Sequence, residues 1–172
     1  TANSFNGEAN LTFDGTTLKT TASTDAQLKI TAGNASSQSR LLFEDSAAVD
    51  ATITYDHNDR LLHIGAGTST PTDGDLIIDS SGRVLIGTTT EGAGGADELT
   101  INTASGHGGM TIRTADDSNG NIWFSDGTSG AAEYAGYLQY AHDGDHMVIG
   151  TNGGERLRID SSGVVRIGGT DT

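Results

Sequence analysis

A twelve-residue phrase occurs twice in this chain, and the repeat limits what the chain can fold into. Residues 76–87 read LIIDSSGRVLIG, and residues 157–168, which lie 81 positions later, read LRIDSSGVVRIG. A repeat of this kind means that the fold copies one supersecondary unit. The matched aliphatic residues alternate along the phrase; they are Leu76, Ile78, Val84 and Ile86 in the first copy and Leu157, Ile159, Val165 and Ile167 in the second.

The residues between these aliphatics change from one copy to the other. Ile77 gives way to Arg158, and Leu85 gives way to Arg166. Because alternate residues of a strand face opposite sides, one face is fixed and apolar while the other face varies. The phrase therefore predicts two short strands joined by an Asp-Ser-Ser-Gly turn, with the matched aliphatics forming the single buried face.

The chain holds too few large apolar residues to enclose a core easily. Leu, Ile, Val and Phe supply 33 of the 172 residues, and the formal net charge is −14. These values lie at the border of the disordered class, so a disordered linker is one interpretation. The regular repeated face favours another, in which several copies of the chain pool their apolar faces. Because the chain has no Cys, disulfides cannot supply the missing stability, and oligomerisation is the favoured explanation.

Turn signals divide the rest of the sequence into short segments. Asp-Gly, Asn-Gly and Ser-Gly pairs recur, and between them lie runs of about four to seven residues with β-branched or aromatic members. This spacing predicts an all-β fold of short antiparallel strands and hairpins. The best helix candidate, residues 130–135, is short and bounded by glycine, so a helix is not favoured there.

Further matches extend the repeat and suggest how the chain is organised. Residues 41–43 match 122–124, Tyr55 matches Tyr140, and residues 28–31 match 99–102, at spacings of 81, 85 and 71. The changes in spacing place insertions in surface loops, one around Pro71, one between Ile101 and Ile122 and one between Phe124 and Tyr140. We therefore divide the chain into a lead-in segment at 1–24 with an Asp14–Gly15 turn, a β module at 25–91, a glycine-rich joint at 92–96 and a second β module at 97–172.

No pattern in the sequence indicates catalysis. Carboxylate pairs such as Asp143 and Asp145 lie at turns, where Asp is expected for backbone reasons. The sequence has no nucleophile elbow, phosphate loop or dinucleotide-binding fingerprint, so we expect neither an enzyme nor a bound cofactor.

The nine Lys and Arg residues are scattered, which argues against a nucleic-acid partner. No apolar run approaches the length needed for membrane insertion.

Two segments have residue types that bind metals elsewhere. His142 and His146 flank the turn at residues 143–145, and His and Asp are good metal ligands. A polar hairpin tip with two solvated histidines is the favoured interpretation. Residues 116–121 resemble a calcium loop but lack the alternating spacing of its ligands, so they are interpreted as a turn. We expect no metal site.

Aromatic residues gather in one part of the chain. Five of the nine Phe, Trp and Tyr residues lie within eighteen positions: Trp123, Phe124, Tyr134, Tyr137 and Tyr140. Aromatic faces stack on sugars and anchor interfaces. Trp123 matches Leu42 on a repeated strand, so it is interpreted as part of a local hydrophobic core. Tyr134 and Tyr137 fall in the inserted segment and are the candidate receptor contacts.

The second copy resembles a known family. Residues 136–149 read GYLQYAHDGDHMVI and are followed by TNGGERLRIDSSG at residues 151–163. These runs resemble the tail-fibre repeats of bacteriophages, of the type common in marine and cyanobacterial phages. The likeness covers residues 136–169 closely and residues 53–88 more loosely. It implies tandem β modules intertwined in an elongated homotrimeric fibre, which is attached to the virion and often binds a receptor at its far end.

The resemblance gives the expected function and partners. We expect a structural segment of a trimeric virion tail fibre, which spaces and presents host-attachment surfaces and is extracellular. The implied partners are two identical subunits, other tail or base-plate proteins, and a glycan or protein of the host cell surface. Two alternatives stay open. One is a distal, glycan-recognising receptor-binding module, supported by Tyr134 and Tyr137, and the other is a cellular surface adhesin or filament subunit.

Overall fold

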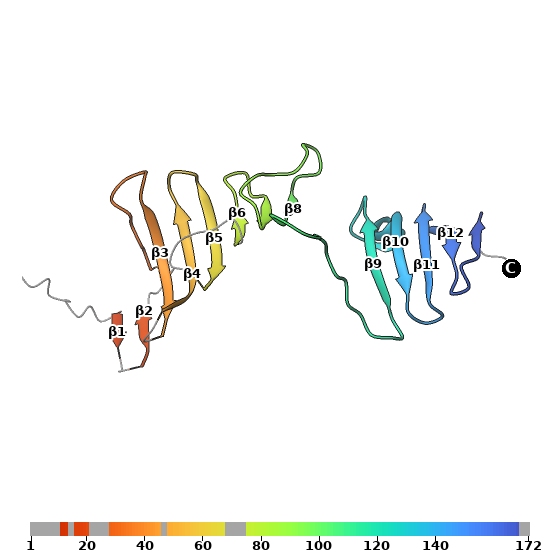
Figure 1. Ribbon diagram of the computed structural model, residues 1–172, viewed down its shortest axis with the longest axis horizontal. Coiled ribbons are helices and arrows are strands. Elements are labelled where there is room, and N and C mark those ends of the chain that lie inside the picture. The colour runs from red at the N-terminus through yellow and green to blue at the C-terminus, as the bar shows by residue number, and fades with distance from the viewer. Residues whose placement is uncertain (1–10, 14–15, 21–27, 46–47, 68–74, 169–172) are drawn as a thin grey trace, which may run out of the picture. The chain divides into compact units, whose positions relative to one another are not determined.

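The chain folds into β-structure, which confirms the predicted all-β class. The structure is a computed structural model that describes residues 11–13, 16–20, 28–45, 48–67 and 75–168 (Figure 1). Contacts divide the chain into two compact units, Thr1–Gly109 (unit 1) and Met110–Thr172 (unit 2). In the described ranges the one helical element is a short 3-10 helix, η1 (Gly130–Tyr134), which lies in the segment judged the best helix candidate.

Unit 1 is built on a six-stranded sheet whose strands follow one another in sequence order. Neighbouring strands are antiparallel except for the last pair, which is parallel. The strands are β3 (Gln38–Glu44), β4 (Val49–Asp56), β5 (Leu61–Ala66), β6 (Leu76–Ile78), β7 (Val84–Ile86) and β8 (Leu99–Ile101). A separate antiparallel pair precedes them, formed by β1 (Leu11–Phe13) and β2 (Leu18–Thr20).

Unit 2 is built on a five-stranded antiparallel sheet, again in sequence order. Its strands are β9 (Asn119–Phe124), β10 (Gly136–Ala141), β11 (His146–Thr151), β12 (Gly154–Ile159) and β13 (Val165–Ile167). The helix η1 lies in the connection between β9 and β10. The antiparallel strands of both sheets therefore form meanders of hairpins, as the turn signals predict, and the parallel strand β8 is the exception in unit 1.

The two sheets align the repeated residues in the same register. Strand pairing places one aliphatic residue of each successive strand opposite the next, and we call each resulting line an aliphatic row. The rows consist of Leu41, Ile53, Ile64, Leu76 and Ile86 in unit 1 and Ile122, Leu138, Ile149, Leu157 and Ile167 in unit 2. Because paired strands lie about 4.8 Å apart, each row places one aliphatic side chain at every such step across its sheet.

The repeated Asp-Ser-Ser-Gly turn has the same geometry in both copies. The amide of Gly82 donates to the carbonyl of Asp79 at 3.0 Å, and Gly163 donates to Asp160 at 2.9 Å. Each Asp carboxylate also accepts from two amides of its own turn, at 2.8 and 3.0 Å in the first copy and 3.0 and 3.0 Å in the second. Gly82 and Gly163 have positive φ angles of 84° and 80°, which explains the glycine at this position.

The structure corrects the prediction about which face of the phrase is buried. The apolar core of unit 1 consists of Leu61, Ile77 and Leu85. Ile77 and Leu85 are completely buried, yet they occupy the positions that vary between the copies. The matched residues of the same strands, such as Leu76 and Ile86, are 38% and 39% exposed. Among the described residues the fixed face is thus only partly covered, and the varying face holds the core of unit 1.

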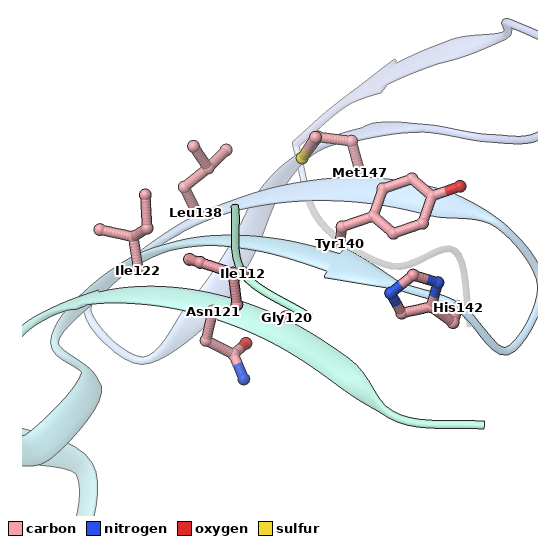
Figure 2. A pocket seen from close by; sticks show the side chains of 8 residues that line it. All are labelled: Ile112, Gly120, Asn121, Ile122, Leu138, Tyr140, His142 and Met147. Carbon is pink, nitrogen blue, oxygen red and sulfur yellow. The ribbon is translucent and has the colours of Figure 1, made fainter. Parts of the chain in front are cut away.

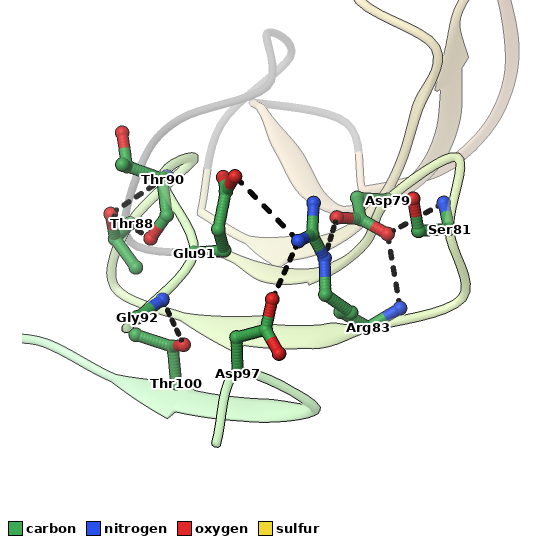
Figure 3. A network of polar contacts seen from close by, with 9 residues as sticks. All are labelled: Asp79, Ser81, Arg83, Thr88, Thr90, Glu91, Gly92, Asp97 and Thr100. Carbon is green, nitrogen blue, oxygen red and sulfur yellow. Dashed lines mark hydrogen bonds and ion pairs between the residues drawn. The ribbon is translucent and has the colours of Figure 1, made fainter. Parts of the chain in front are cut away.

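The connection between β7 and β8 explains why Leu85 is buried. Arg83 lies on the same face as Leu85 and forms ion pairs with Asp97 at 2.8 Å and with Glu91 at 3.6 Å (Figure 3). The amide of Gly92 donates to the hydroxyl of Thr100, the residue paired with Leu85, at 2.9 Å. The connection is therefore held against the varying face of this sheet.

The division of the chain differs from the boundaries drawn on the sequence. The boundary between the compact units falls after Gly109, whereas residues 97–172 were assigned to the second module. Strand β8 pairs with β7 and so completes the sheet of unit 1. Residues 92–96, assigned as the joint, lie in the connection between these two strands. The turn at Asp14–Gly15 and the insertion around Pro71 lie outside the described residues.

Candidate functional site

The aliphatic rows form a line of partly exposed apolar side chains across the described sheet of each unit. Nine of their ten side chains are exposed, by 36% to 82%, and Leu157 is half-buried. Each row is flanked on the same face by further apolar residues, for example Phe43 and Ile78 in unit 1 and Phe124 and Ile159 in unit 2. Contiguous exposed apolar surface of this kind marks an interaction site.

The balance of buried and exposed apolar residues is inverted relative to a self-sufficient domain. In the described ranges, 24 large apolar side chains are exposed, whereas five apolar residues are buried: Leu61, Ile77, Leu85, Ala141 and Val148. Fully burying an aliphatic side chain stabilises a protein by about 1.5–3 kcal/mol, so covering the remaining two-fifths of one is worth roughly 0.6–1.2 kcal/mol. A surface that covered both rows would therefore add a large part of the stability of a small domain.

A hollow of about 250 Å³ lies on the row face of unit 2. It is lined by Ile112, Gly120, Asn121, Ile122, Leu138, Tyr140, His142 and Met147, and Figure 2 shows the side chains of Ile112, Ile122 and Leu138 gathered at one end of it. Ile112 precedes β9 and approaches Gly120, where an added Cβ would lie 3.6 Å from its Cγ2. The hollow is thus part of the same apolar face.

Tyr140 and His142 border this hollow in an edge-to-face arrangement, with ring centroids 5.0 Å apart. Tyr55 and His57 form the same pair in unit 1, at 4.9 Å. The hydroxyl of Tyr140 donates to the carboxylate of Asp145 at 3.1 Å, and this hydrogen bond raises the pKa of the tyrosine. The Tyr–His pair is therefore a repeated packing feature at the hairpin end.

The histidines and carboxylates considered as metal ligands do not gather into one cluster. His142 and His146 lie at the two ends of the β10–β11 hairpin connection, where the amide of Asp145 donates to the carbonyl of His142 at 3.4 Å. Residues 115–118 form a turn closed by Ser118 donating to Ala115 at 3.1 Å. In the residues that the structure describes, no group of three or more His, Asp or Glu side chains is placed to hold a metal ion.

The varying face of unit 2 bears arginines where unit 1 has its core. Arg158 and Arg166 stand opposite each other on β12 and β13, in the places of Ile77 and Leu85. The guanidinium of Arg158 donates to Glu155 at 2.8 Å, and that hydrogen bond raises the pKa of Arg158 and lowers the pKa of Glu155. At β12 and β13 this side of the second sheet therefore carries paired charges in place of the apolar core of unit 1.

An aromatic hollow of about 210 Å³ lies on this same varying face. It is lined by Trp123, Tyr134, Tyr137, Gln139 and Gly153. The rings of Trp123 and Tyr134 have centroids 5.7 Å apart and are tilted by 53°. Trp123 is 53% exposed and Tyr134 is 37% exposed. The two tyrosines proposed from the sequence as receptor contacts are therefore brought together, beside the single tryptophan.

Two local features position these rings. The backbone between Phe124 and its partner Gly136 spans 12 positions, against eight between Phe43 and its partner Ala51 in unit 1, and the extra length forms η1. Hydrogen bonds hold this connection, from Asp126 to Ala132 at 3.0 Å and from Gly153 to Ala135 at 3.1 Å.

The second feature is a glycine beneath a ring. Tyr137 pairs with Gly150, and a Cβ added to Gly150 would overlap the ring of Tyr137. The glycine therefore lets this ring lie across the strand.

Two interpretations of the aromatic residues need correction. Tyr137 lies within strand β10, at the place of Thr52 in unit 1, and not in the inserted connection. Trp123 was interpreted as a core residue, but it is more than half exposed. The alternation of the strand contains the signal for this, because Ile122 belongs to the aliphatic row and its neighbour must face the other side.

Comparisons of the chain with protein-family models, with curated proteins and with solved structures find no match. Among the described residues, no helix is both long and apolar enough to span a membrane.

Proposed function

We propose that the chain is a structural segment of a homotrimeric virion tail fibre, which spaces and presents host-attachment surfaces. The exposed aliphatic rows carry this proposal. Three of the five row positions carry the same residue in both units and the other two exchange Leu and Ile, whereas Ile77 and Leu85 on the opposite face are replaced by Arg158 and Arg166. An apolar face that its own chain covers only in part is stabilised by packing against another apolar face. A second copy of the chain offers such a face.

The order of the strands explains how the rows would meet. In both meanders the chain advances from strand to strand in sequence order, so each row crosses its strands and extends in the direction in which the chain advances. Three sheets with their rows turned to a common axis would enclose a continuous aliphatic interior. The two meanders would then act as tandem modules along that axis, in agreement with the tail-fibre resemblance of residues 136–169.

The polar groups of the opposite face fit the outside of such an assembly. Arg158 and Arg166 are engaged in ion pairs with Glu155 and Asp160 on the varying face of unit 2. Loops on the outside would contact the host surface, and threefold presentation would strengthen weak contacts by avidity. The expected location is the extracellular virion, with base-plate or other tail proteins as further partners.

Two neighbouring leucines provide a matched test. Leu41 belongs to the aliphatic row and is 40% exposed, and Leu42 faces the opposite side and is 39% exposed. The native mass of wild type, Leu41→Asp and Leu42→Asp would be measured by sedimentation equilibrium over a range of concentrations, together with mobility in an unheated detergent gel. We expect a trimer for wild type and Leu42→Asp, and dissociation for Leu41→Asp. A monomeric wild type, or equal behaviour of the two variants, would contradict the proposal.

A receptor-binding module is the second candidate, because the exposed rings of Trp123 and Tyr134 form a hollow on the side away from the row. A cellular surface adhesin or filament subunit would have the same assembly. Detection of base-plate proteins with the chain in purified particles would separate the viral from the cellular assignment.

A further inference from the structure

The aromatic hollow of unit 2 is not accounted for by assembly through the aliphatic rows. Its strand residues Trp123, Tyr137 and Gln139 are adjacent in sequence to Ile122 and Leu138, which belong to the row, so they face the opposite side of the sheet. A partner bound to the row would leave the hollow open to solvent. This hollow therefore has a role of its own, separate from assembly.

We propose that this hollow binds the ring of a neutral hexose, such as the terminal sugar of a surface glycan. The inference deepens the second candidate function, the receptor-binding module, and it does not depend on the oligomeric state. At about 210 Å³ the hollow is smaller than the roughly 300–1,000 Å³ of sites for drug-sized ligands, which favours a single ring.

The lining supplies both kinds of contact that a sugar ring needs. One face of a β-linked hexopyranose presents axial C–H groups, which pack on exposed aromatic faces such as those of Trp123 and Tyr134. The hydroxyl groups at its rim need hydrogen-bonding partners. Gln139 provides an amide beside the rings, and its Nε2 is held by the Oδ1 of Asn121 at 2.8 Å. The amide oxygen of Gln139 and the tyrosine hydroxyls are of the type that bonds sugar hydroxyls.

The charges around the hollow favour a neutral sugar over an acidic one. The chain has a net charge of −14, and Glu133 directly precedes Tyr134. Arg158, on the same face of the sheet, is already paired with Glu155. The net negative charge of the chain would therefore disfavour an anionic sugar.

The equivalent strands of unit 1 carry different residues at these positions. The residues in the places of Trp123, Tyr137 and Gln139 are Leu42, Thr52 and Thr54, and both threonines are buried. The aromatic lining is thus specific to unit 2 and cannot be a requirement of the meander itself.

The experiment uses Trp123 as its own reporter, because it is the single tryptophan of the chain. Fluorescence of the full chain would be titrated with methyl β-D-galactopyranoside and methyl β-D-glucopyranoside. Sorbitol serves as an open-chain control, and N-acetylneuraminic acid serves as an anionic sugar. A single exposed ring site of this size should saturate with a dissociation constant on the order of 1–10 mM. Saturation-transfer NMR on the sugar protons gives a second readout, which does not depend on fluorescence.

Two variants test whether the sugar binds at the aromatic hollow. Tyr134→Ala removes one ring from the short helix and should weaken binding about tenfold or more, which corresponds to about 1.4 kcal/mol. Tyr55→Ala is the matched control, since Tyr55 has the same 37% exposure as Tyr134 but lies on the row face of unit 1. The affinity of Tyr55→Ala for the sugar should equal that of wild type.

Several outcomes would overturn the inference. These are the absence of saturation by either neutral sugar, an equal response to sorbitol, tighter binding of the anionic sugar, or unchanged affinity in Tyr134→Ala. Native mass measured on the same samples keeps this result separate from the fibre proposal. A monomer that binds the sugar would support the sugar site and contradict the trimeric fibre. A trimer that does not bind the sugar would support the fibre and contradict the sugar site.

Discussion

Asp160 accepts a hydrogen bond of 2.6 Å from the guanidinium of Arg166, six residues further along the chain. In the first copy of the same turn, Asp79 accepts a 2.6 Å bond from Arg83, four residues further along. The arginine has thus changed position between the copies while the ion pair with the turn has been kept. The position that loses its arginine, Val164, and the one that gains it, Arg166, account for two of the differences between the repeated phrases.

This ion pair predicts a dependence of unit 2 on acid. The hydrogen bond from Arg166, with the amides of Val164 and Ser162, holds the pKa of Asp160 below its ordinary value of 3.8. A carboxylate whose pKa is lowered by folding contributes stability that is present above the ordinary pKa and is lost as the pH falls through the lowered one. We expect urea unfolding of unit 2 to be insensitive to this group above about pH 5 and to become easier below about pH 4.

Asp160→Asn keeps an acceptor for the turn but removes the charge, so its unfolding should vary less with pH below 4 than that of wild type. If both proteins lost the same stability between pH 5 and pH 3, Asp160 would not be the responsible group.

The inversion of the two sheet faces gives a second prediction. Ile77 is completely buried and Ile86 is 39% exposed on the neighbouring strand. Ile77→Ala should destabilise unit 1 by about 2–5 kcal/mol, because it leaves a cavity in a packed core. Ile86→Ala should cost only about 1–2 kcal/mol in a dissociated chain, since about two-fifths of this side chain is already in water. Chemical unfolding followed by circular dichroism measures the cost of each substitution, at protein concentrations above and below those at which the chain assembles.

In the assembled state the cost of Ile86→Ala should rise toward that of Ile77→Ala. An equally small cost of Ile86→Ala in both states would argue against a covered row.

The sequence alone predicts the hairpins well and the buried face poorly, and the reason is physical. The Asn152–Gly153 pair needs positive φ at both residues, and the structure has 54° and 69°. Alternation shows that Leu76 and Ile77 face opposite sides, but it does not show which side is covered. That depends on where the β7–β8 connection lies, which follows from the ion pairs of Arg83 with Glu91 and Asp97. Such contacts between distant residues leave no periodic signal.

A close approach of glycine to a buried carboxylate gives a third prediction. A Cβ added to Gly65 would overlap the carboxylate of Asp75, which is 5% exposed and lies 3.5 Å from the Nδ1 of His63. Gly65→Ala must displace this carboxylate or the strand beside it, and we expect a loss of about 1–3 kcal/mol in the free energy of unfolding. Gly33→Ala is the control, because no heavy atom lies within 4 Å of the added Cβ, and its effect should be within about 0.5 kcal/mol. Thermal unfolding of the two variants compares them directly. Equal midpoints would show that the Asp75 carboxylate can move aside at little cost in free energy.

The aromatic hollow shows a similar division between what can and cannot be predicted. Clustering of aromatic residues around position 134 is visible in the sequence, and the structure places Tyr134 and Tyr137 in one hollow. The strand position of Tyr137 is not apparent from the sequence, because the change in spacing locates the insertion only to the interval between Phe124 and Tyr140. Gly150, which gives the ring of Tyr137 its space, is not recognisable as part of the site without the pairing of β10 and β11.

A fourth prediction concerns the parallel strand that closes unit 1. Arg83 joins the Asp79 turn to Asp97, two residues before β8 begins, through hydrogen bonds of 2.6 and 2.8 Å (Figure 3). The amides of Val84 and Asn102 report on the β7–β8 pairing, since they donate to Glu98 and Ile86, each at 2.8 Å. Arg83→Met keeps much of the aliphatic stem but removes the charge, so these two amides should exchange with solvent faster than in wild type.

Amide hydrogen exchange followed by NMR at neutral pH measures this effect residue by residue. Arg166→Met is the matched control, because it removes an arginine from the equivalent ion pair in unit 2 and should leave Val84 and Asn102 unchanged. Because β8 has one paired neighbour in the described part of the sheet, it depends on the contacts of its connection more than a central strand does. Unchanged protection of both amides in Arg83→Met would mean that the backbone pairing holds β8 without help from the Arg83 ion pairs.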